Sequence, residues 1–350
     1  MREAAIRSAL IAALLAILPA GCEVLDPEDE PPQEQILFIS GEGNAEDIYR
    51  INADGSGLIN LTRSPGLYQS LEVTPDGRTV LFHKETDCQI WTMTPDGSNQ
   101  QPLGESCARL PRVSPNGQLL AYENGNAIHV MEIDGTDPRT VSQDLPPVQP
   151  SPCGETPKWS VWPFGWVSAS RFAFRRHICQ VGNTYYSVNA DGSGLIELDF
   201  NPETGHLSPD ATQVAFDRIH DGIDQRSVTV MNVDGSNRRE VADDGWLPSH
   251  SWYSRSPWSP NGRQLYYWRA DGHHLVDVGN STSRRLAEPP TEAGFMGWSP
   301  QGDRMLFNVI ERDQTGVIVS SDLYVVNADG TGPVNLTRNA AFETEAVWVP

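Results

Sequence analysis

From residue 36 onward, the chain consists of short apolar stretches with alternating polarity, each ending at a turn rich in glycine, proline, asparagine or aspartate. Stretches of this length and period predict β-strands rather than helices. Asx-Gly turns predict hairpins, because glycine accepts a positive φ and the Asx side chain bonds to its own turn. A strand followed by such a turn recurs at 48–57, 90–99, 128–137, 185–194, 228–237 and 323–332, with a degenerate copy at 274–283.

A second, proline-containing turn precedes most of these units, at 74–77, 114–117, 208–210, 259–262 and 299–302. The strand after it carries an aromatic residue at an equivalent place in every repeat: Phe38, Phe82, Tyr122, Phe174, Phe216, Tyr267 and Phe307. Each repeat therefore predicts four short strands. Four-stranded repeats of roughly 40–45 residues are typical of propeller blades.

These repeats predict an all-β protein folded as a seven-bladed β-propeller, with six blades as the alternative count. The last residues, 346–350, resemble the strand that precedes a proline turn, whereas residues 36–39 resemble the strand that follows one. We therefore expect the C-terminal strand to enter the first blade and close the ring. An open solenoid is the alternative, but its terminal repeats would be capped rather than complementary.

The repeat resembles that of the TolB-type propeller family, a WD-repeat-like fold. Residues 258–262 (WSPNG) and 298–302 (WSPQG) match its first motif, and 52–57 (NADGSG) and 327–332 (NADGTG), each followed by Leu-Thr, match its second. The resemblance implies the fold and says little about function. TolB itself has six blades and an additional N-terminal domain, so the resemblance does not imply a role in the Tol envelope system.

The N-terminus has the features of an export signal. Basic residues precede an apolar stretch at 9–18, which is too short to span a membrane. The sequence Leu-Pro-Ala-Gly-Cys ending at Cys22 resembles a bacterial lipobox, although the family usually has leucine where this chain has Pro19. We predict a lipoprotein signal peptide at 1–21, lipidation of Cys22, an acidic, proline-rich tether at 22–35 and the propeller at 36–350. An ordinary cleaved secretory signal is the alternative.

The chain is acidic, with 46 Asp and Glu against 25 Lys and Arg and a formal net charge of −21. This charge argues against nucleic-acid binding, which requires clustered basic residues. We expect an exported monomer, anchored to the bacterial membrane through its lipid and facing the periplasm or the cell exterior. Its expected partner is an unidentified envelope protein or a glycan.

No catalytic residues are predicted, because the chain lacks a nucleophile elbow, a phosphate-binding glycine loop and a zinc-protease motif. Neither a metal nor a cofactor is predicted, and the Asp-Gly turns carry too few ligands for a calcium loop. The preferred function is a ligand- or protein-binding scaffold module. The alternative is a metal-dependent polysaccharide lyase similar to the oligogalacturonate lyases. Its metal would be bound by histidines, most of which we expect to lie in loops.

Two groups of residues are candidate ligand contacts. The segment 243–257 contains Trp246, His250, Trp252, Tyr253 and Arg255, and aromatic side chains with a few polar groups suit sugars or partner side chains. A structural mini-core beneath a long loop is the slightly favoured alternative for these rings. Arg175, Arg176 and His177 form a basic cluster that either binds a ligand or pairs with nearby carboxylates.

Four cysteines follow Cys22, and export would place them where disulfides persist. The repeat places Cys88 and Cys107 in loops of one blade, and Cys153 and Cys179 in loops beside another. We therefore predict the bridges Cys88–Cys107 and Cys153–Cys179, because other pairings would have to span an intervening blade.

Overall fold

The computed structural model describes residues 34–350 apart from 44, 147–158, 180–181, 199–204, 220–225, 249–255, 288–289, 291 and 340. Residues Glu34–Pro350 form one compact unit. The described residues are all-β, with strands and no α-helix, and no described helix is long and apolar enough to cross a membrane. The predicted signal peptide, the lipidation site Cys22 and most of the predicted tether lie outside the described residues.

Most strands belong to antiparallel sheets whose members follow one another in the sequence. One sheet contains β4 (Tyr68–Val73), β5 (Val80–Lys84), β6 (Gln89–Met93) and β7 (Gln101–Ser106). The next contains β8 (Arg109–Val113), β9 (Leu119–Asn124), β10 (Ala127–Glu132) and β11 (Arg139–Thr140). A third contains β12 (Trp159–Ser168), β13 (Arg171–Ile178), β14 (Gly182–Asn189) and β15 (Ile196–Leu198).

The following sheets continue this order. One contains β16 (Gly205–Leu207), β17 (Gln213–Ile219), β18 (Arg226–Asn232) and β19 (Arg239–Ala242). A three-stranded sheet contains β20 (Gln264–Arg269), β21 (Gly272–Asp277) and β22 (Thr282–Arg285), and a bridge from Trp258 to Leu265 lies beside β20.

The largest sheet has eight strands and joins the two ends of the described chain. It contains β23 (Ala293–Trp298), β24 (Arg304–Arg312), β25 (Ile318–Asn327) and β26 (Val334–Asn335), followed by β27 (Phe342–Trp348), β1 (Gln35–Glu42), β2 (Ala45–Asn52) and β3 (Ile59–Asn60). β27 pairs antiparallel with β1, with Ile36 opposite Trp348. A single parallel residue pair, Ser321 with Phe342, connects β25 to β27.

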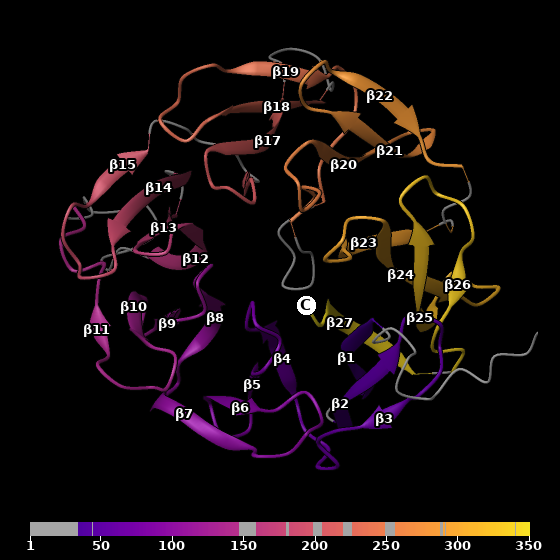
Figure 1. Ribbon diagram of the computed structural model, residues 1–350, viewed down its shortest axis with the longest axis horizontal. Coiled ribbons are helices and arrows are strands. Elements are labelled where there is room, and N and C mark those ends of the chain that lie inside the picture. The colour runs from indigo at the N-terminus through magenta and orange to yellow at the C-terminus, as the bar shows by residue number, and fades with distance from the viewer. Residues whose placement is uncertain are drawn as a thin grey trace, which may run out of the picture. The chain divides into compact units, whose positions relative to one another are not determined.

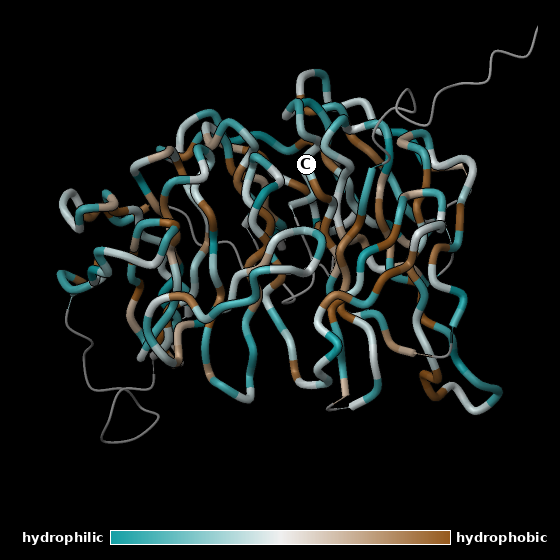
Figure 2. The backbone as a smooth tube through the Cα atoms, turned by 60° about the horizontal axis from the view of Figure 1, so that its bottom comes forward, coloured by the Kyte–Doolittle hydropathy of each residue, from teal (hydrophilic) through white to brown (hydrophobic). Residues whose placement is uncertain are grey.

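Within this unit the sheets follow one another around a ring in chain order (Figure 1). Strands such as β4, β8, β12 and β27 lie nearer the middle, and strands such as β7, β11 and β15 lie at the rim (Figure 1). Four-stranded antiparallel sheets in this arrangement are the architecture of a β-propeller. The apolar segments run mainly along the strands, whereas most turns are hydrophilic (Figure 2).

The recurring aromatic residues occupy equivalent places and form much of the core. Each lies on the strand after the position of the proline turn, and none is more than 3% exposed. The set comprises Phe38, Phe82, Tyr122, Phe174, Phe216, Tyr267 and Phe307. Their burial shows that this recurring position of the repeat faces the interior.

Each proline turn begins with a serine or threonine whose buried hydroxyl group bonds to the strand that follows. The Ser259 hydroxyl accepts a hydrogen bond from the backbone N–H of Gln264 at 2.9 Å, which ties the turn to the strand that follows. The equivalent bonds at Thr74, Ser114, Ser208 and Ser299 are 2.9–3.0 Å long. In the Asp-Gly turns, carboxylates such as Asp191 accept the backbone N–H two residues later, at 2.9 Å for Ser193. The Asp-Gly carboxylates thus have a structural role within their own turns.

Three tryptophan indoles connect neighbouring sheets. The indole N–H of Trp166 donates to the carbonyl of Arg112 at 2.8 Å, and that of Trp258 donates to His206 at 2.9 Å. The indole of Trp298 donates to the carbonyl of Pro257 at 3.0 Å. The tryptophan of the Trp-Ser-Pro motif therefore contributes to packing between repeats.

The prediction that most histidines lie in loops is wrong for the part of the chain that the structure describes. His83, His129, His177, His206, His273 and His274 all lie on strands. His83 and His206 are buried, because a strand position that faces a neighbouring sheet excludes water from even a polar ring. His220 and His250 lie outside the described residues.

Candidate functional site

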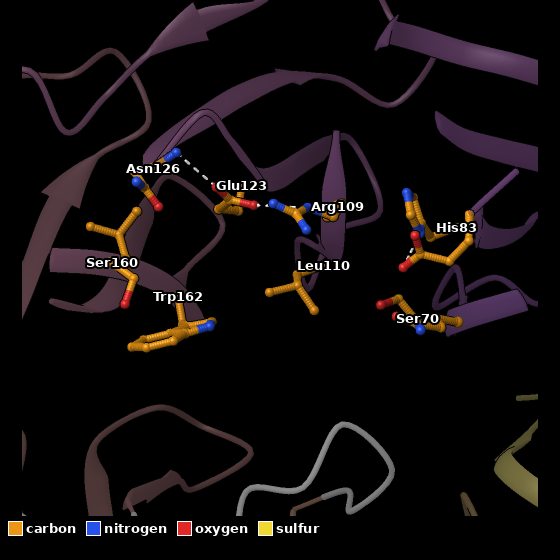
Figure 3. Close-up of a pocket in the computed structure, with 11 residues that line it drawn as sticks. Ser70, His83, Arg109, Leu110, Glu123, Asn126, Ser160 and Trp162 are labelled. Atoms are coloured by element: carbon orange, nitrogen blue, oxygen red, sulfur yellow. Dashed lines mark hydrogen bonds and ion pairs between the residues drawn. The ribbon is translucent and has the colours of Figure 1, made fainter. Parts of the chain in front are cut away.

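A cavity of about 420 Å³ lies where three consecutive sheets approach one another (Figure 3). Its volume falls within the range of roughly 300–1,000 Å³ that is usual for small-molecule sites. β4, β5, β8, β9 and β12, with the turns that follow β5 and β9, supply its lining. The lining residues are Gln69, Ser70, His83, Glu85, Arg109, Leu110, Glu123, Asn126, Ser160, Val161 and Trp162.

The lining arises from the repeat, because the first two strands of each sheet contribute matching cross-strand positions. Gln69 lies opposite His83 in one sheet, and Arg109 lies opposite Glu123 in the next. Trp162 takes the corresponding place on β12, opposite Arg175. His83 and Glu123 each directly follow one of the recurring buried aromatics in the sequence.

Irregular backbone opens the inner strands at the cavity. The pairing of β4 with β5 shifts register between Gln69 and Glu72, and that of β8 with β9 shifts between Arg109 and Arg112. Within these bulges Ser70 has a φ of 58° and Leu110 a φ of 56°, values uncommon for residues other than glycine. Bulges redirect side chains and are frequent beside binding sites.

The bulge in β4 is held from outside its own sheet. The backbone N–H groups of Ser70 and Leu71 donate to the two carboxylate oxygens of Glu345, each at 2.7 Å. Glu345 lies on β27 and is 3% exposed. Charge-assisted bonds of this kind are among the stronger hydrogen bonds in proteins. The last strand of the chain thus fixes one wall of the cavity.

An ion pair forms another wall. Arg109 Nε lies 3.3 Å from Glu123 Oε2, and the Glu123 side chain is only 7% exposed. The backbone N–H of Asn126 donates to the other carboxylate oxygen at 2.8 Å. The Arg109 side chain is 53% exposed, so its guanidinium group is accessible beside a carboxylate that is held in place.

His83 lies beside this pair, between Glu85 and Arg109. Its side chain is 1% exposed, and its Nδ1 lies 3.7 Å from Glu85 Oε1. Burial lowers the pKa of the imidazole; Glu85 raises it in part, and Arg109 lowers it further. The ring is therefore neutral at neutral pH. Its Nε2 has no hydrogen-bond partner within the described part of the protein.

Apolar groups line the remaining side of the cavity. They are Leu110, Val161 and the ring of Trp162. The guanidinium group of Arg175 lies 4.4 Å from the centroid of the Trp162 ring, and the His177 ring lies at 6.2 Å. A cation–π contact of this kind holds the indole in a defined orientation.

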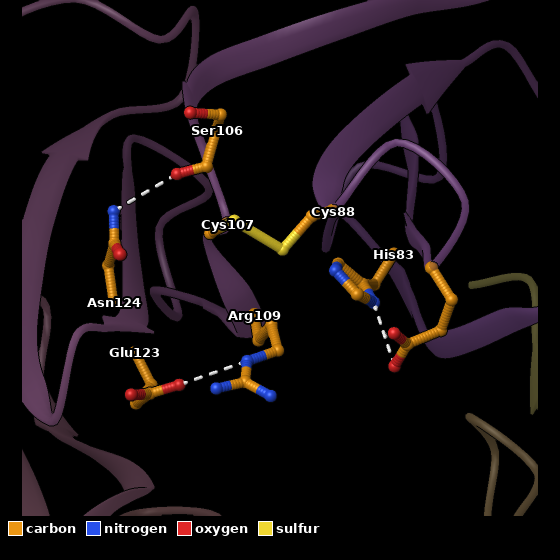
Figure 4. The surroundings of a disulfide bond; sticks show 8 residues. His83, Cys88, Ser106, Cys107, Arg109, Glu123 and Asn124 are labelled. Atoms are coloured by element: carbon orange, nitrogen blue, oxygen red, sulfur yellow. Dashed lines mark hydrogen bonds and ion pairs between the residues drawn. A yellow bond between two sulfur atoms is a disulfide. The ribbon is translucent and has the colours of Figure 1, made fainter.

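A disulfide joins two of the segments that line the cavity (Figure 4). Cys88 is bonded to Cys107, and their Cα atoms are 4.4 Å apart. Glu85 lies three residues before Cys88, and Arg109 lies two residues after Cys107. The predicted Cys88–Cys107 pairing is therefore present, and disulfides of this kind are typical of oxidising, extracytoplasmic compartments. Cys179 is also disulfide-bonded; its predicted partner, Cys153, lies outside the described residues.

None of the described residues that were predicted to contact a ligand lines this cavity. Trp246 is half-buried, and its ring stacks at a tilt on Trp268 with centroids 4.3 Å apart. This packing matches the structural alternative considered for the loop aromatics. His250, Trp252, Tyr253 and Arg255 lie outside the described residues, so their role stays a prediction.

The predicted basic cluster belongs to strand β13, which pairs with the lining strand β12. Arg176 is 4% exposed and donates to the carbonyl of Pro146 at 2.7 Å. His177 contacts Asn183 through its Nδ1, at 3.0 Å from the amide oxygen. Of this cluster, Arg175 and His177 contact the lining residue Trp162. The cluster thus supports the cavity, whereas the side chains that line it were not singled out from the sequence.

Among the residues that the structure describes, no group of three or more His, Cys, Asp and Glu side chains is placed to hold a metal ion.

Solved structures similar to the chain share its fold. TolB from Acinetobacter baumannii has 14% identity and a TM-score of 0.53, covering 91% of this chain and 67% of that one. An oligogalacturonate lyase in complex with manganese has 15% identity and a TM-score of 0.55, with coverages of 87% and 85%. Dipeptidyl peptidase 4 from Porphyromonas gingivalis has 12% identity and a TM-score of 0.50, and the chain spans about half of it (53%). No protein-family model and no curated protein matches the chain.

Proposed function

We propose that this chain is an exported, lipid-anchored β-propeller that binds a ligand in the cavity between β4, β8 and β12. The observation that carries the proposal is the cavity itself: about 420 Å³, with charged, polar and apolar side chains converging from three sheets. Rigid strands on a closed frame hold binding groups with little loss of conformational entropy on binding. This geometry supports a binding or scaffold role, which we propose for the cell envelope because of the export signal predicted from the sequence.

The proposed frame has seven blades closed by β27. The eight-stranded sheet divides into two blades at the single residue pair between β25 and β27. The three-stranded sheet gains its fourth strand from the bridge at Trp258. With the remaining four-stranded sheets, the proposed count is seven rather than six, and β27 with β1 completes the ring.

Export and anchoring rest on the predicted signal at 1–21 and on Cys22, and the Cys88–Cys107 disulfide is consistent with an oxidising compartment. Detergent-phase partitioning of the protein expressed in a bacterial host tests the anchor. We expect the mature protein in the detergent phase and the Cys22→Ala variant in the aqueous phase. A mature protein that stays aqueous, or that starts elsewhere, contradicts lipidation.

Ligand binding is tested with a variant that fills the cavity without altering its charge. We propose a thermal-shift screen of a metabolite and glycan library against the wild-type protein and Ser160→Trp. Ligands of the cavity raise the melting temperature of the wild-type protein only. Ligands that stabilise both proteins equally bind elsewhere and contradict the proposed site, as does a library without any hit.

A metal-dependent lyase is the second candidate from the sequence. It requires metal ligands, and two of the eight histidines, His220 and His250, lie outside the described residues. Metal analysis of the purified full-length chain is the direct test. One equivalent of bound divalent metal, together with release of unsaturated sugars from polygalacturonate, would favour the lyase over the binding module.

A further inference from the structure

We propose that the cavity binds a neutral sugar, with one ring face against Trp162 and the hydroxyl groups directed to Arg109, Glu85 and Glu123. This inference rests on the proposed binding function and adds the chemical class of the ligand. Three features of the lining support it: its charges, its separate apolar and polar sides, and its hydrogen-bond donors and acceptors.

Arg109 compensates one of the two carboxylates of the lining. Arg109 is the one basic side chain in the lining apart from His83, whose ring is neutral, and it is already paired with Glu123 at 3.3 Å. Glu85 adds a second carboxylate. An anionic ligand would compete with Glu123 for Arg109 and would approach two carboxylates. A cationic ligand would approach Arg109. A neutral ligand avoids both costs, since like charges in proximity disfavour binding.

The lining has an apolar side and a polar side. Leu110 and Trp162 lie on one side of the group formed by Arg109, Glu123 and Asn126 (Figure 3). A pyranose ring has the matching distribution, with C–H groups on its faces and hydroxyl groups around its rim. Aromatic rings bury such apolar faces well while polar groups fix the orientation. Arg175 lies over the Trp162 ring and keeps the indole oriented before a ligand arrives.

The polar side contains both hydrogen-bond donors and hydrogen-bond acceptors. The side chains of Gln69, Asn126 and Ser160 make no hydrogen bond to any described residue, although all three line the cavity. Amides carry both a donor and an acceptor, guanidinium groups only donate, and carboxylates only accept. A hydroxyl group both donates and accepts, so a ligand with several hydroxyl groups can satisfy all of these partners at once.

The test compares disaccharides of similar size and different charge. A glycan array identifies neutral glycans that bind, and isothermal titration calorimetry then measures cellobiose, maltose, N,N′-diacetylchitobiose, its cationic deacetylated form and anionic digalacturonate. We expect a neutral glycan to bind at least tenfold more tightly than either charged disaccharide. Trp162→Ala should weaken that binding at least tenfold, and Trp162→Phe should retain most of it.

Trp268→Ala is the matched control. Trp268 is also a half-buried tryptophan stacked on another side chain, but it does not line the cavity, so its loss should leave sugar binding unchanged. Binding of digalacturonate alone, or of no neutral glycan on the array, overturns the inference. Sugar binding that persists in Trp162→Ala also overturns it. If Ser160→Trp still abolishes binding of a charged or non-sugar ligand, the proposed function stands and only the ligand class is wrong.

Discussion

At the residue scale, Glu343 is a carboxyl group kept in an environment that disfavours its charge. It is 2% exposed on β27. Ser40 Oγ donates to its Oε1 at 3.2 Å and Asn339 Nδ2 at 3.0 Å. Burial raises the pKa of Glu343 to about 7; the bonds from Asn339 and Ser40 act in the opposite direction, and nearby Asp322 raises it. Between the usual pKa of 4.5 and the raised pKa of about 7, Glu343 is therefore protonated in the folded protein and ionised in the unfolded chain.

This proton sets a pH dependence of stability. Because the folded pKa of about 7 lies above the usual 4.5, the free energy of unfolding falls as pH rises through this interval. The full effect is on the order of 3 kcal/mol. We expect Glu343→Gln to raise the melting temperature at pH 8 and to change it little at pH 4.5. Equal shifts at both pH values in thermal unfolding would contradict the raised pKa.

At the element scale, the disulfide connects the turn after β5 to the segment entering β8. It thereby links the segment of Glu85 to the segment of Arg109. A crosslink across 19 residues restricts the unfolded chain and contributes about 3 kcal/mol in the chain-entropy account. Its second consequence is geometric, because it holds two oppositely charged cavity residues in one arrangement.

We expect the double variant Cys88→Ser/Cys107→Ser to fold with a lower melting temperature and with weaker ligand binding than the wild-type protein. Thermal unfolding measures the first effect, and calorimetry with a cavity ligand, performed well below the melting temperature, measures the second. A variant that loses stability but binds with unchanged affinity would show that the disulfide does not organise the cavity.

The strands and turns could be predicted because their determinants are local. Glycine, proline and Asx residues mark the turns, and the recurring aromatics mark the buried face. The cavity could not be predicted in the same way. The bulges at Ser70 and Leu110 depend on pairing between strands, and the approach of Arg109 to His83 depends on packing between sheets. The burial of His83 could not be predicted from the polarity of its ring, because burial depends on its strand position next to Phe82.

At the scale of the whole molecule, β27 carries several long-range contacts. It pairs with β1, and its Glu345 binds the bulge of β4. Deleting residues 345–350 removes both the pairing of Trp348 with Ile36 and this carboxylate. We expect a large fall in the melting temperature and loss of ligand binding, because an inner strand edge and two backbone N–H groups lose their partners.

Deleting only Val349 and Pro350 is the control for this truncation, because it retains all of β27 and Glu345. It should cost much less stability. If both deletions leave the melting temperature unchanged, the ring does not depend on β27, and the proposed seven-bladed closure is wrong.

The pairing of β27 with β1 also constrains the order of events during folding. The hydrogen bond from Ser40 to Glu343 connects residues 303 positions apart. Contacts at such sequence separation form late, because the entropy of closing the intervening loop has to be overcome first. During synthesis, the edge of β1 that pairs with β27 therefore stays unpaired until residues 342–348 have been synthesised. A chain that stalls early would keep that edge exposed, and proteases and chaperones that recognise unpaired strands could distinguish it from a finished molecule.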